Sequence, residues 1–154
     1  MGASLVMKLD DALRTVNLLG LDTSPFIYFV ERNLLYVDLM REVFKRLTDG
    51  NFAACSSVIT LTEVLVQPFR QNNPTLANDY RDLLFNAGNF RLLSLTASIA
   101  ELAAELRAKY NLRTPDALQI ATALDNGCDA FLCNDNGLRR VTELKILILN
   151  EIEL

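Results

Sequence analysis

Four acidic residues stand at the boundaries of apolar segments, where side chains from distant parts of a chain can meet. Asp22 closes one apolar run, and Asp135 comes shortly after another. Glu63 and Asp116 fall in the first turns of two expected helices. Carboxylates are the ligands that Mg²⁺ and Mn²⁺ prefer in proteins, and water fills the remaining coordination positions. Because a cation held in this way polarises a phosphate oxygen and acidifies bound water, the four acids predict metal-dependent hydrolysis of a phosphodiester.

The composition removes several other kinds of catalytic site. The chain of 154 residues has no histidine, which excludes Ser-His-Asp and Cys-His nucleophile arrangements. Its three cysteines, Cys55, Cys128 and Cys133, lack the further thiols or imidazoles that a tetrahedral zinc site needs. A net charge of −4 does not indicate tight, nonspecific binding of nucleic acid. If the phosphodiester belongs to a nucleic acid, the metal must supply much of the local positive charge.

Each of the four acids also has a purely structural explanation. Glu63 completes the segment 60–63, Thr-Leu-Thr-Glu, which is a capping box. Asp116, at the second position of its helix, would interact favourably with the helix dipole. Asp135 precedes Asn-Gly and could belong to a turn, and Asp22 could cap one. The sequence leaves these alternatives open, and Asp22 is the acid that they explain least well.

The order of apolar segments and turn signals predicts an α/β fold. Strands alternate with helices, which is typical of a parallel sheet covered on both faces. No repeat or linker divides the sequence, and 51% of its residues are hydrophobic, so we expect one domain over 1–154, with 1–17 as a leading helical extension. Strands are expected at 18–21, within 52–59, and at 90–95, 130–133 and 145–149. Helices are expected at 7–16, 25–30, 36–47, 60–68, 75–86, 98–110 and 116–124.

Three helix starts are important because they place the acids. Ser24-Pro25 and Thr114-Pro115 each have a capping residue followed by proline at the first helical position. Thr60 is the expected start of the helix that carries Glu63. If these helices begin at the sheet edge where the strands end, all four carboxylates converge on one pocket. Open α/β sheets bind their ligands at this edge.

Nothing in the sequence predicts insertion into a membrane or export. No apolar run approaches the roughly 20 residues that span a bilayer. The first segment contains Lys8, Asp10, Asp11 and Arg14, which makes it a poor signal peptide. We therefore expect a cytoplasmic protein with reduced, mostly buried thiols.

Four segments resemble the sequence motifs of PIN domains, in the order in which that family has them. The segments are Leu21–Tyr28 with its Asp-Thr pair, Ser56–Leu65, Leu112–Ala123, and Phe131–Asp135 with Leu138–Val141 after it. The resemblance spans nearly the whole chain, from Leu18 to about Leu149. It implies a three-layer α/β/α sandwich with a central parallel sheet. It also implies endoribonuclease activity at a Mg²⁺ or Mn²⁺ site formed by Asp22, Glu63, Asp116 and Asp135.

The resemblance further implies partners. Many small stand-alone PIN proteins are toxins of the VapC type, which form dimers and are silenced by an antitoxin protein that inserts into the site. We accordingly expect an RNA substrate, a homodimer and an antitoxin, as in a type II toxin–antitoxin pair. The sequence departs from the family pattern at Cys133, where relatives often have Thr or Ser, and at Gly137, where they often have a second acid. These departures weaken the case for a second metal ion and leave the first unaffected.

Other residues are assigned for less specific reasons. Thr23 and Ser24 are candidates to orient a carboxylate or contact a phosphate. Four arginines are candidates to guide the RNA backbone, although a charged helix face explains each more simply: Arg32, Arg70, Arg113 and Arg139. The homodimer is expected to pair through apolar residues of two helices, namely Tyr36, Met40, Val43, Phe44, Leu47, Val64, Leu65 and Phe69.

Two other functions remain open from the sequence. A non-catalytic PIN-fold module could bind RNA or a partner protein, but grouped carboxylates repel one another unless a cation joins them. A phosphate-transferring enzyme with Asp22 as nucleophile would need a second acid two residues later, where Ser24 stands. The dependence of RNA cleavage on a divalent metal distinguishes the ribonuclease from both.

Overall fold

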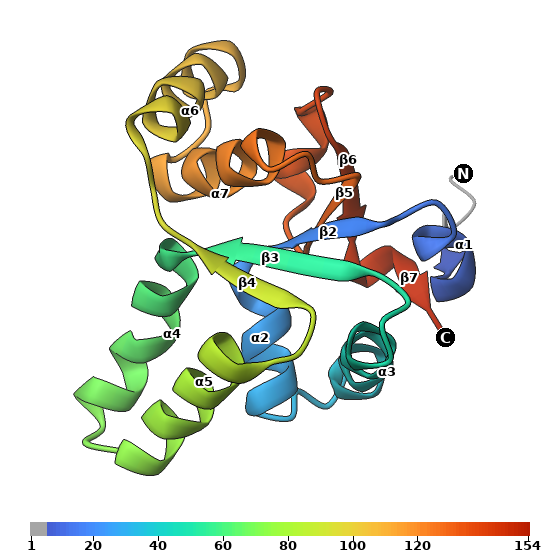
Figure 1. Cartoon of the computed structure of the whole chain (residues 1–154), viewed down its shortest axis with the longest axis vertical. Coiled ribbons are helices and arrows are strands. Elements are labelled where there is room, and N and C mark those ends of the chain that lie inside the picture. The colour runs from blue at the N-terminus through green and yellow to red at the C-terminus, as the bar shows by residue number, and fades with distance from the viewer. Residues whose placement is uncertain (1–5) are drawn as a thin grey trace.

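A five-stranded parallel sheet forms the centre of the protein, of which the computed structural model describes residues 6–154 (Figure 1). The strand order is β4-β3-β2-β5-β6. The strands are β2 (Leu18–Leu21), β3 (Ala53–Ser57), β4 (Phe90–Leu93), β5 (Ala130–Cys133) and β6 (Lys145–Ile148). The chain builds outward from β2 to β4 and then returns to the other side of β2, so the order reverses between β2 and β5. In open α/β sheets such a switch point is where ligands bind.

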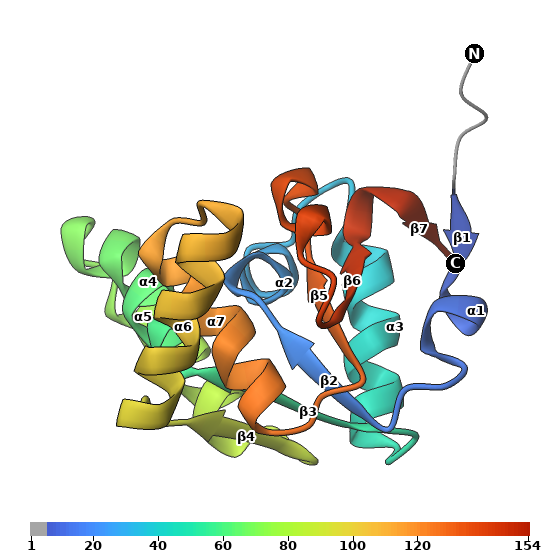
Figure 2. The same ribbon diagram turned by 90° about the horizontal axis from the view of Figure 1, so that it is seen from above.

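Helices cover both faces of the sheet, which confirms the expected three-layer α/β/α sandwich (Figures 1 and 2). On one face lie α6 (Ala97–Tyr110) and α7 (Thr114–Asp125). On the other lie α2 (Thr23–Val30), α3 (Val37–Thr48), α4 (Val58–Arg70) and α5 (Pro74–Asn86). Each face has its own buried apolar cluster.

Side chains along β2 point alternately to the two faces of the sheet, and the residue that faces α7 determines how closely that helix packs. Leu19 and Leu21 are buried in the cluster with α2 and α3, and Gly20 points the other way, toward α7. A Cβ atom on Gly20 would lie 2.9 Å from the Cβ of Ala123 and 3.0 Å from Cδ1 of Phe131. Only glycine allows α7 to pack this closely, and the start of α7 carries one of the four acids.

Three helices begin at least two residues earlier than the sequence predicts. Asp22 is the N-cap residue of α2, so Ser24 lies inside the first turn and is not its cap. Ser57 is the N-cap of α4, where its hydroxyl accepts a hydrogen bond from the backbone N–H of Ile59 at 3.1 Å. Thr60, the expected start, is fully buried within α4. Helix α7 likewise begins at Thr114 itself. The strands run almost directly into α2 and α4, since only Asp22 separates β2 from α2 and no residue separates β3 from α4.

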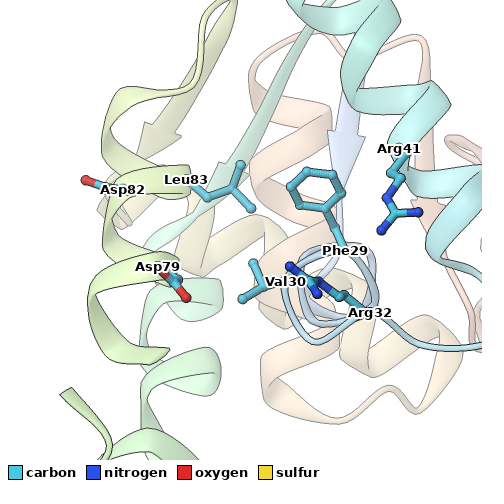
Figure 3. A pocket seen from close by; sticks show the side chains of 7 residues that line it. All are labelled: Phe29, Val30, Arg32, Arg41, Asp79, Asp82 and Leu83. Carbon is cyan, nitrogen blue, oxygen red and sulfur yellow. The ribbon is translucent and has the colours of Figure 1, made fainter. Parts of the chain in front are cut away.

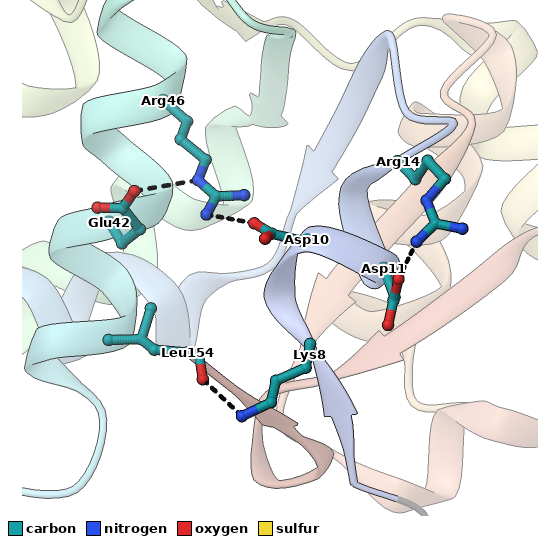
Figure 4. A network of polar contacts seen from close by, with 7 residues as sticks. All are labelled: Lys8, Asp10, Asp11, Arg14, Glu42, Arg46 and Leu154. Carbon is teal, nitrogen blue, oxygen red and sulfur yellow. Dashed lines mark hydrogen bonds and ion pairs between the residues drawn. The ribbon is translucent and has the colours of Figure 1, made fainter.

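The leading segment differs from the helix expected over 7–16. It forms the two-residue strand β1 (Met7–Lys8) and the five-residue helix α1 (Leu9–Leu13), and β1 pairs with β7 (Ile152–Glu153). Figure 4 shows how charges tie this segment to α3 and to the C-terminus. Arg46 bonds to Asp10 at 2.6 Å and to Glu42 at 3.1 Å, and Lys8 donates to the Leu154 oxygen at 3.0 Å. The first five residues of the expected extension lie outside the described residues.

Most of the apolar residues expected at a dimer interface are instead buried within the single chain. Five of the eight have 6% exposure or less: Met40, Val43, Phe44, Leu47 and Val64. The apolar face of α3 therefore packs inward, and that part of the expectation is wrong. Phe69, near the end of α4, is 57% exposed.

Two expectations drawn from composition can also be compared with the structure. Across residues 6–154, no helix combines the length and apolar character needed to cross a bilayer. Cys55, Cys128 and Cys133 are all buried and free, as the sequence predicts.

Candidate active site

A pocket of about 340 Å³ opens where α2, α4 and α7 begin, beside the ends of β2 and β5. We call it the acidic pocket. It brings together all four predicted acids and both predicted hydroxyl residues. Its lining consists of Asp22, Thr23, Ser24, Ile27, Tyr28, Glu63, Arg113, Asp116, Asn134 and Asp135. Sequence reasoning named Arg113 only as an RNA contact and assigned no role to Ile27, Tyr28 or Asn134.

Asp22 reaches the acidic pocket because β2 ends directly before it. Its backbone N–H donates to the carbonyl of Leu132 in β5 at 3.0 Å, which continues the pairing of the two strands. Although Asp22 is the N-cap residue of α2, its side chain makes no capping hydrogen bond. The carboxylate is therefore not needed to start the helix and lines the pocket.

Glu63 does not form the capping box that the sequence allows. Because Ser57 caps α4, Glu63 lies in the second turn and has no N-terminal backbone group to satisfy. Its Oε1 instead accepts a hydrogen bond from the hydroxyl of Thr23. This bond joins α4 to α2 and orients the Glu63 carboxylate at the pocket, which is the role suggested for Thr23.

A layer of buried hydroxyl and amide groups lies beneath the acids. Gln119 of α7 donates from Nε2 to the Thr60 hydroxyl at 2.7 Å, and its Oε1 accepts from the Ser57 hydroxyl at 2.6 Å. The hydroxyl oxygens of Ser56 and Thr60 are 2.7 Å apart, and Gln119 Nε2 also lies 3.3 Å from the Thr23 hydroxyl. All five residues are buried. These hydrogen bonds fix α2, α4 and α7 relative to one another, because a buried polar group that lost its partner would be costly.

Asp116 is held by the one basic residue of the pocket. The Nε of Arg113 lies 3.1 Å from Oδ2 of Asp116, and the Asp116 side chain is only 14% exposed. Arg113 is 77% exposed, so water and salt screen this ion pair and it contributes little to stability. The pair leaves the other three acids without a cationic partner in the pocket.

Asp135 has both a structural contact and a place in the pocket. It is the N-cap of the short helix η1 (Asn136–Arg140), where its Oδ1 accepts from the backbone N–H of Gly137 at 2.8 Å. A Cβ atom on Gly137 would lie only 3.1 Å from that oxygen, so glycine avoids a tight contact with the Asp135 carboxylate. The turn explanation for Asp135 is therefore correct, and it does not remove the residue from the pocket.

Cys133 stands behind the acidic pocket rather than in it. It is fully buried at the end of β5, and burial raises the pKa of its thiol to about 12. A neutral thiol in this place does not offer a ligand to a metal ion, because the thiolate is the ligand form.

Burial and the neighbouring acids both affect the pKa of Asp22. Burial of the carboxyl group is the largest cause of a rise to about 6, the backbone N–H of Thr23 opposes the rise, and the negative charges of Asp116, Glu63 and Asp135 add to it. Within residues 6–154, no three acidic, histidine or cysteine side chains already stand close enough to ligate one ion. The residues nevertheless fit a hard divalent cation, because four oxygen donors share one pocket and carry an excess of negative charge.

The remaining arginines lie elsewhere. Arg139 pairs with Glu151, and Arg70 is exposed at the end of α4. Arg32 lines a second hollow of about 320 Å³ between α2, α3 and α5, which we call the interhelical hollow (Figure 3). Its lining residues are Phe29, Val30, Arg32, Arg41, Asp79, Asp82 and Leu83.

Comparisons with known proteins identify the family and the fold. A family model, that of the PIN domain, matches residues 20–144. No curated protein matches the sequence significantly. Among solved structures, VapBC2 from Rickettsia felis bound to a promoter DNA fragment has a TM-score of 0.71 at 15% identity, covering 85% of this chain and 98% of the other. A toxin–antitoxin complex from Klebsiella pneumoniae has a TM-score of 0.62 at 21% identity, with coverage of 87% and 98%. DNA-bound VapBC from Salmonella typhimurium has a TM-score of 0.61 at 19% identity, with coverage of 88% and 99%.

Proposed function

The chain belongs to the PIN domain family, and from this premise we propose that it is a metal-dependent endoribonuclease acting at the acidic pocket. One observation carries the proposal. Four carboxylates from four separate segments line one pocket, and a single solvated arginine opposes them. Asp22, Glu63 and Asp116 would hold a Mg²⁺ or Mn²⁺ ion, with Asp135 binding directly or through water.

A bound ion would polarise a phosphate oxygen and supply hydroxide near neutral pH. The protein's own residues do the positioning. The Thr23 hydroxyl holds Glu63, and the amide of Gln119 fixes the buried layer below both. Arg113, whose side chain is largely exposed beside Asp116, would contact the RNA backbone. Ser24, at the pocket wall, has a hydroxyl that can contact a phosphate.

The requirement for metal tests this proposal. Labelled single-stranded and structured RNA should be cleaved internally by the purified chain in Mg²⁺ or Mn²⁺. Cleavage should stop when EDTA is added and should return when excess Mg²⁺ is restored. Cleavage that continues in EDTA, or no cleavage of any RNA in either metal, would contradict the proposal.

Two alternatives predict other results in the same assay. A non-catalytic PIN-fold module would bind RNA or a partner protein without cleaving RNA. A phosphate-transferring enzyme would leave a phosphorylated Asp22, which acid-quenched protein mass would show. Neither alternative explains why Glu63 and Asp116 are directed to the same pocket as Asp22 and Asp135.

We also propose an antitoxin partner, so that the chain is the toxin of a type II pair in the cytoplasm. The fold shared with proteins of toxin–antitoxin complexes supports the antitoxin partner. The three buried free thiols support the cytoplasmic location. Expression of the chain alone should slow growth of a bacterial host. Coexpression of the neighbouring reading frame should restore growth and yield a copurifying complex. Unimpaired growth with active ribonuclease in the cell would argue against a toxin.

We also propose a homodimer whose interface is formed by α4 and α5, because the apolar face of α3 packs inward. Phe69 and Phe85 are 57% and 59% exposed on these two helices, which pack against each other. Light scattering at micromolar concentration should give twice the chain mass of 17.2 kDa. Phe69→Glu should reduce the mass to that of a monomer, and Thr75→Glu, at an exposed site on α5, should not. A monomeric wild-type protein would refute the dimer.

A further inference from the structure

Tyr28 brings a neutral hydrogen-bond donor to the acidic pocket. It lies one turn after Ser24 on the same face of α2 and directly follows Ile27, and all three residues line the pocket. Its ring stacks on that of Tyr36, with 4.7 Å between ring centroids and 22° between ring planes. Because this stacking holds the ring in place, the hydroxyl has a defined position at the pocket wall.

The polarity of the hydrogen bonds at Tyr28 is determined by a backbone group. The N–H of Asn150, in the short helix η2 (Leu149–Glu151), lies 2.9 Å from Oδ1 of Asn134. A backbone N–H can only donate, so the Asn134 carbonyl must face it and the Asn134 NH₂ must face the opposite way. That NH₂ group lies 3.1 Å from the Tyr28 oxygen, and it too can only donate.

The Tyr28 oxygen is therefore an acceptor in this chain of hydrogen bonds, and its own proton is left over. Within residues 6–154, no hydrogen bond uses that proton. An approaching phosphodiester would bring negatively charged oxygens, which accept strongly from a neutral hydroxyl. Arg113 already contacts Asp116, and the Thr23 hydroxyl already donates to Glu63.

We propose that the Tyr28 hydroxyl donates a hydrogen bond to a non-bridging phosphate oxygen of the RNA, which makes Tyr28 a substrate-binding residue. The inference rests on the proposed ribonuclease function. Asn134 is a positioning residue, since it fixes the direction in which the Tyr28 proton points. A hydrogen bond to a charged group changes affinity by about 10- to 100-fold, which sets the size of the expected effect.

Two single variants test whether RNA binding depends on the hydroxyl of Tyr28 and not on that of Tyr36. Tyr28→Phe removes only the proposed donor and keeps the ring on Tyr36. It should raise KM for RNA by about 10-fold or more and leave the midpoint of Mg²⁺ activation unchanged. Tyr36→Phe is the matched control, because the Tyr36 hydroxyl donates to the Asn150 side chain at 3.1 Å and does not line the pocket. It should retain wild-type KM.

A double-mutant cycle tests the direction of the proton. In Asn134→Asp the side chain has only acceptor oxygens, so the Tyr28 proton should turn to it and away from the substrate. Adding Tyr28→Phe to Asn134→Asp should then leave KM for RNA unchanged, although Tyr28→Phe raises KM in the wild-type background. Any effect of the added charge on metal binding is common to both members of that comparison and cancels.

The results of these experiments separate the role of Tyr28 from the ribonuclease function. A wild-type KM for Tyr28→Phe, or an equal cost of that change in both backgrounds, would overturn the role of Tyr28 and leave the ribonuclease function standing. Wild-type protein that cleaves no RNA in either Mg²⁺ or Mn²⁺ would overturn the function and this inference with it. Thermal midpoints of all variants confirm that each is folded.

Discussion

The two ends of α2 carry pockets of similar size and different electrostatics. The acidic pocket, at the N-terminal end, holds four carboxylates and one arginine in about 340 Å³. The interhelical hollow, at the C-terminal end, holds two arginines and two aspartates in about 320 Å³ (Figure 3). Charges in the hollow balance within the protein, whereas those in the acidic pocket leave an excess that a divalent cation can neutralise.

The floors of the two pockets also differ. Phe29, Val30 and Leu83 form an apolar floor in the hollow, which needs no hydrogen-bond partner. Beneath the acidic pocket lie buried hydroxyls joined by the Gln119 amide. The two pockets therefore differ not in volume but in the unbalanced charge above a fixed polar layer, and each part of this contrast can be broken by substitution.

The largest expected effect is on catalysis. Asp116→Asn removes a proposed metal ligand and should reduce cleavage in Mg²⁺ by about 1000-fold, as the loss of a key electrostatic contact does in other enzymes. Asp79→Asn, an equivalent change in the interhelical hollow, should leave the rate unchanged. Initial rates of RNA cleavage at saturating Mg²⁺ provide the measurement. Equal rates in Asp116→Asn and wild type would remove the distinction between the two pockets.

The next effect is on stability and its dependence on pH. The Asp22 pKa is about 6 in the folded protein against an ordinary value of 3.8, so the folded state binds this proton more tightly than the unfolded chain. The stability that this proton gives to the folded state is fully present below pH 3.8 and is lost as the pH rises through about 6. The loss lowers the free energy of unfolding by at most about 3 kcal/mol.

Urea unfolding of the metal-free protein from pH 4 to pH 7 measures this contribution. Asp22→Asn should be more stable than wild type at pH 7 and should lose the decline in stability across this window. Asp82→Asn, in the hollow, should keep the wild-type dependence. Mg²⁺ should stabilise wild type at pH 7 and should stabilise Asp22→Asn less. An unchanged pH profile in Asp22→Asn would show that burial and the neighbouring acids do not raise the pKa of Asp22 in the folded protein.

The sheet and the position of the acids could be predicted because local pattern specifies them. The bounds of β2 and β5 agree with the short apolar runs at 18–21 and 130–133, and parallel strands bring the residues at their carboxyl ends to one edge. The start of α4 could not be predicted, because Ser57 and Thr60 are both good caps and only burial of Thr60 decides between them. The capping box around Glu63 was a false local signal for the same reason.

Contacts between distant segments account for the other omissions. Gln119 lies three positions after Asp116 in an otherwise apolar stretch of helix, which is a signal for a buried polar role, but its hydroxyl partners come from another element. Tyr28 and Asn134 are 106 positions apart, and nothing local indicates that they meet. Pairing of β1 with β7 joins the two ends of the chain and is invisible to any local pattern.

A smaller effect is expected from the polar floor. Gln119→Leu makes the core more apolar but leaves the Ser57 hydroxyl without its acceptor, so it should destabilise the protein by about 1–3 kcal/mol. Ser57→Ala also removes the cap of α4, so it should destabilise both backgrounds, but by less in Gln119→Leu, where the Ser57 hydroxyl has already lost its acceptor. Urea midpoints of the two single variants and the double variant form the cycle. Strict additivity would mean that Gln119 and Ser57 act independently.

The smallest effect is expected from the charges of the interhelical hollow. Arg41 bonds to Asp38 at 3.3 Å with side chains 56% and 81% exposed, so water and salt screen the pair. Arg41→Gln should change the free energy of unfolding by about 0.5 kcal/mol or less, and the difference should vanish in about 1 M salt. The same variant should cleave RNA at the wild-type rate, since the hollow lies at the far end of α2 from the acids. Urea unfolding at low and high salt, with RNA cleavage measured alongside, tests both statements. A lower rate with normal stability would show that RNA extends along α2 into the hollow, and the two pockets would then form one continuous binding surface.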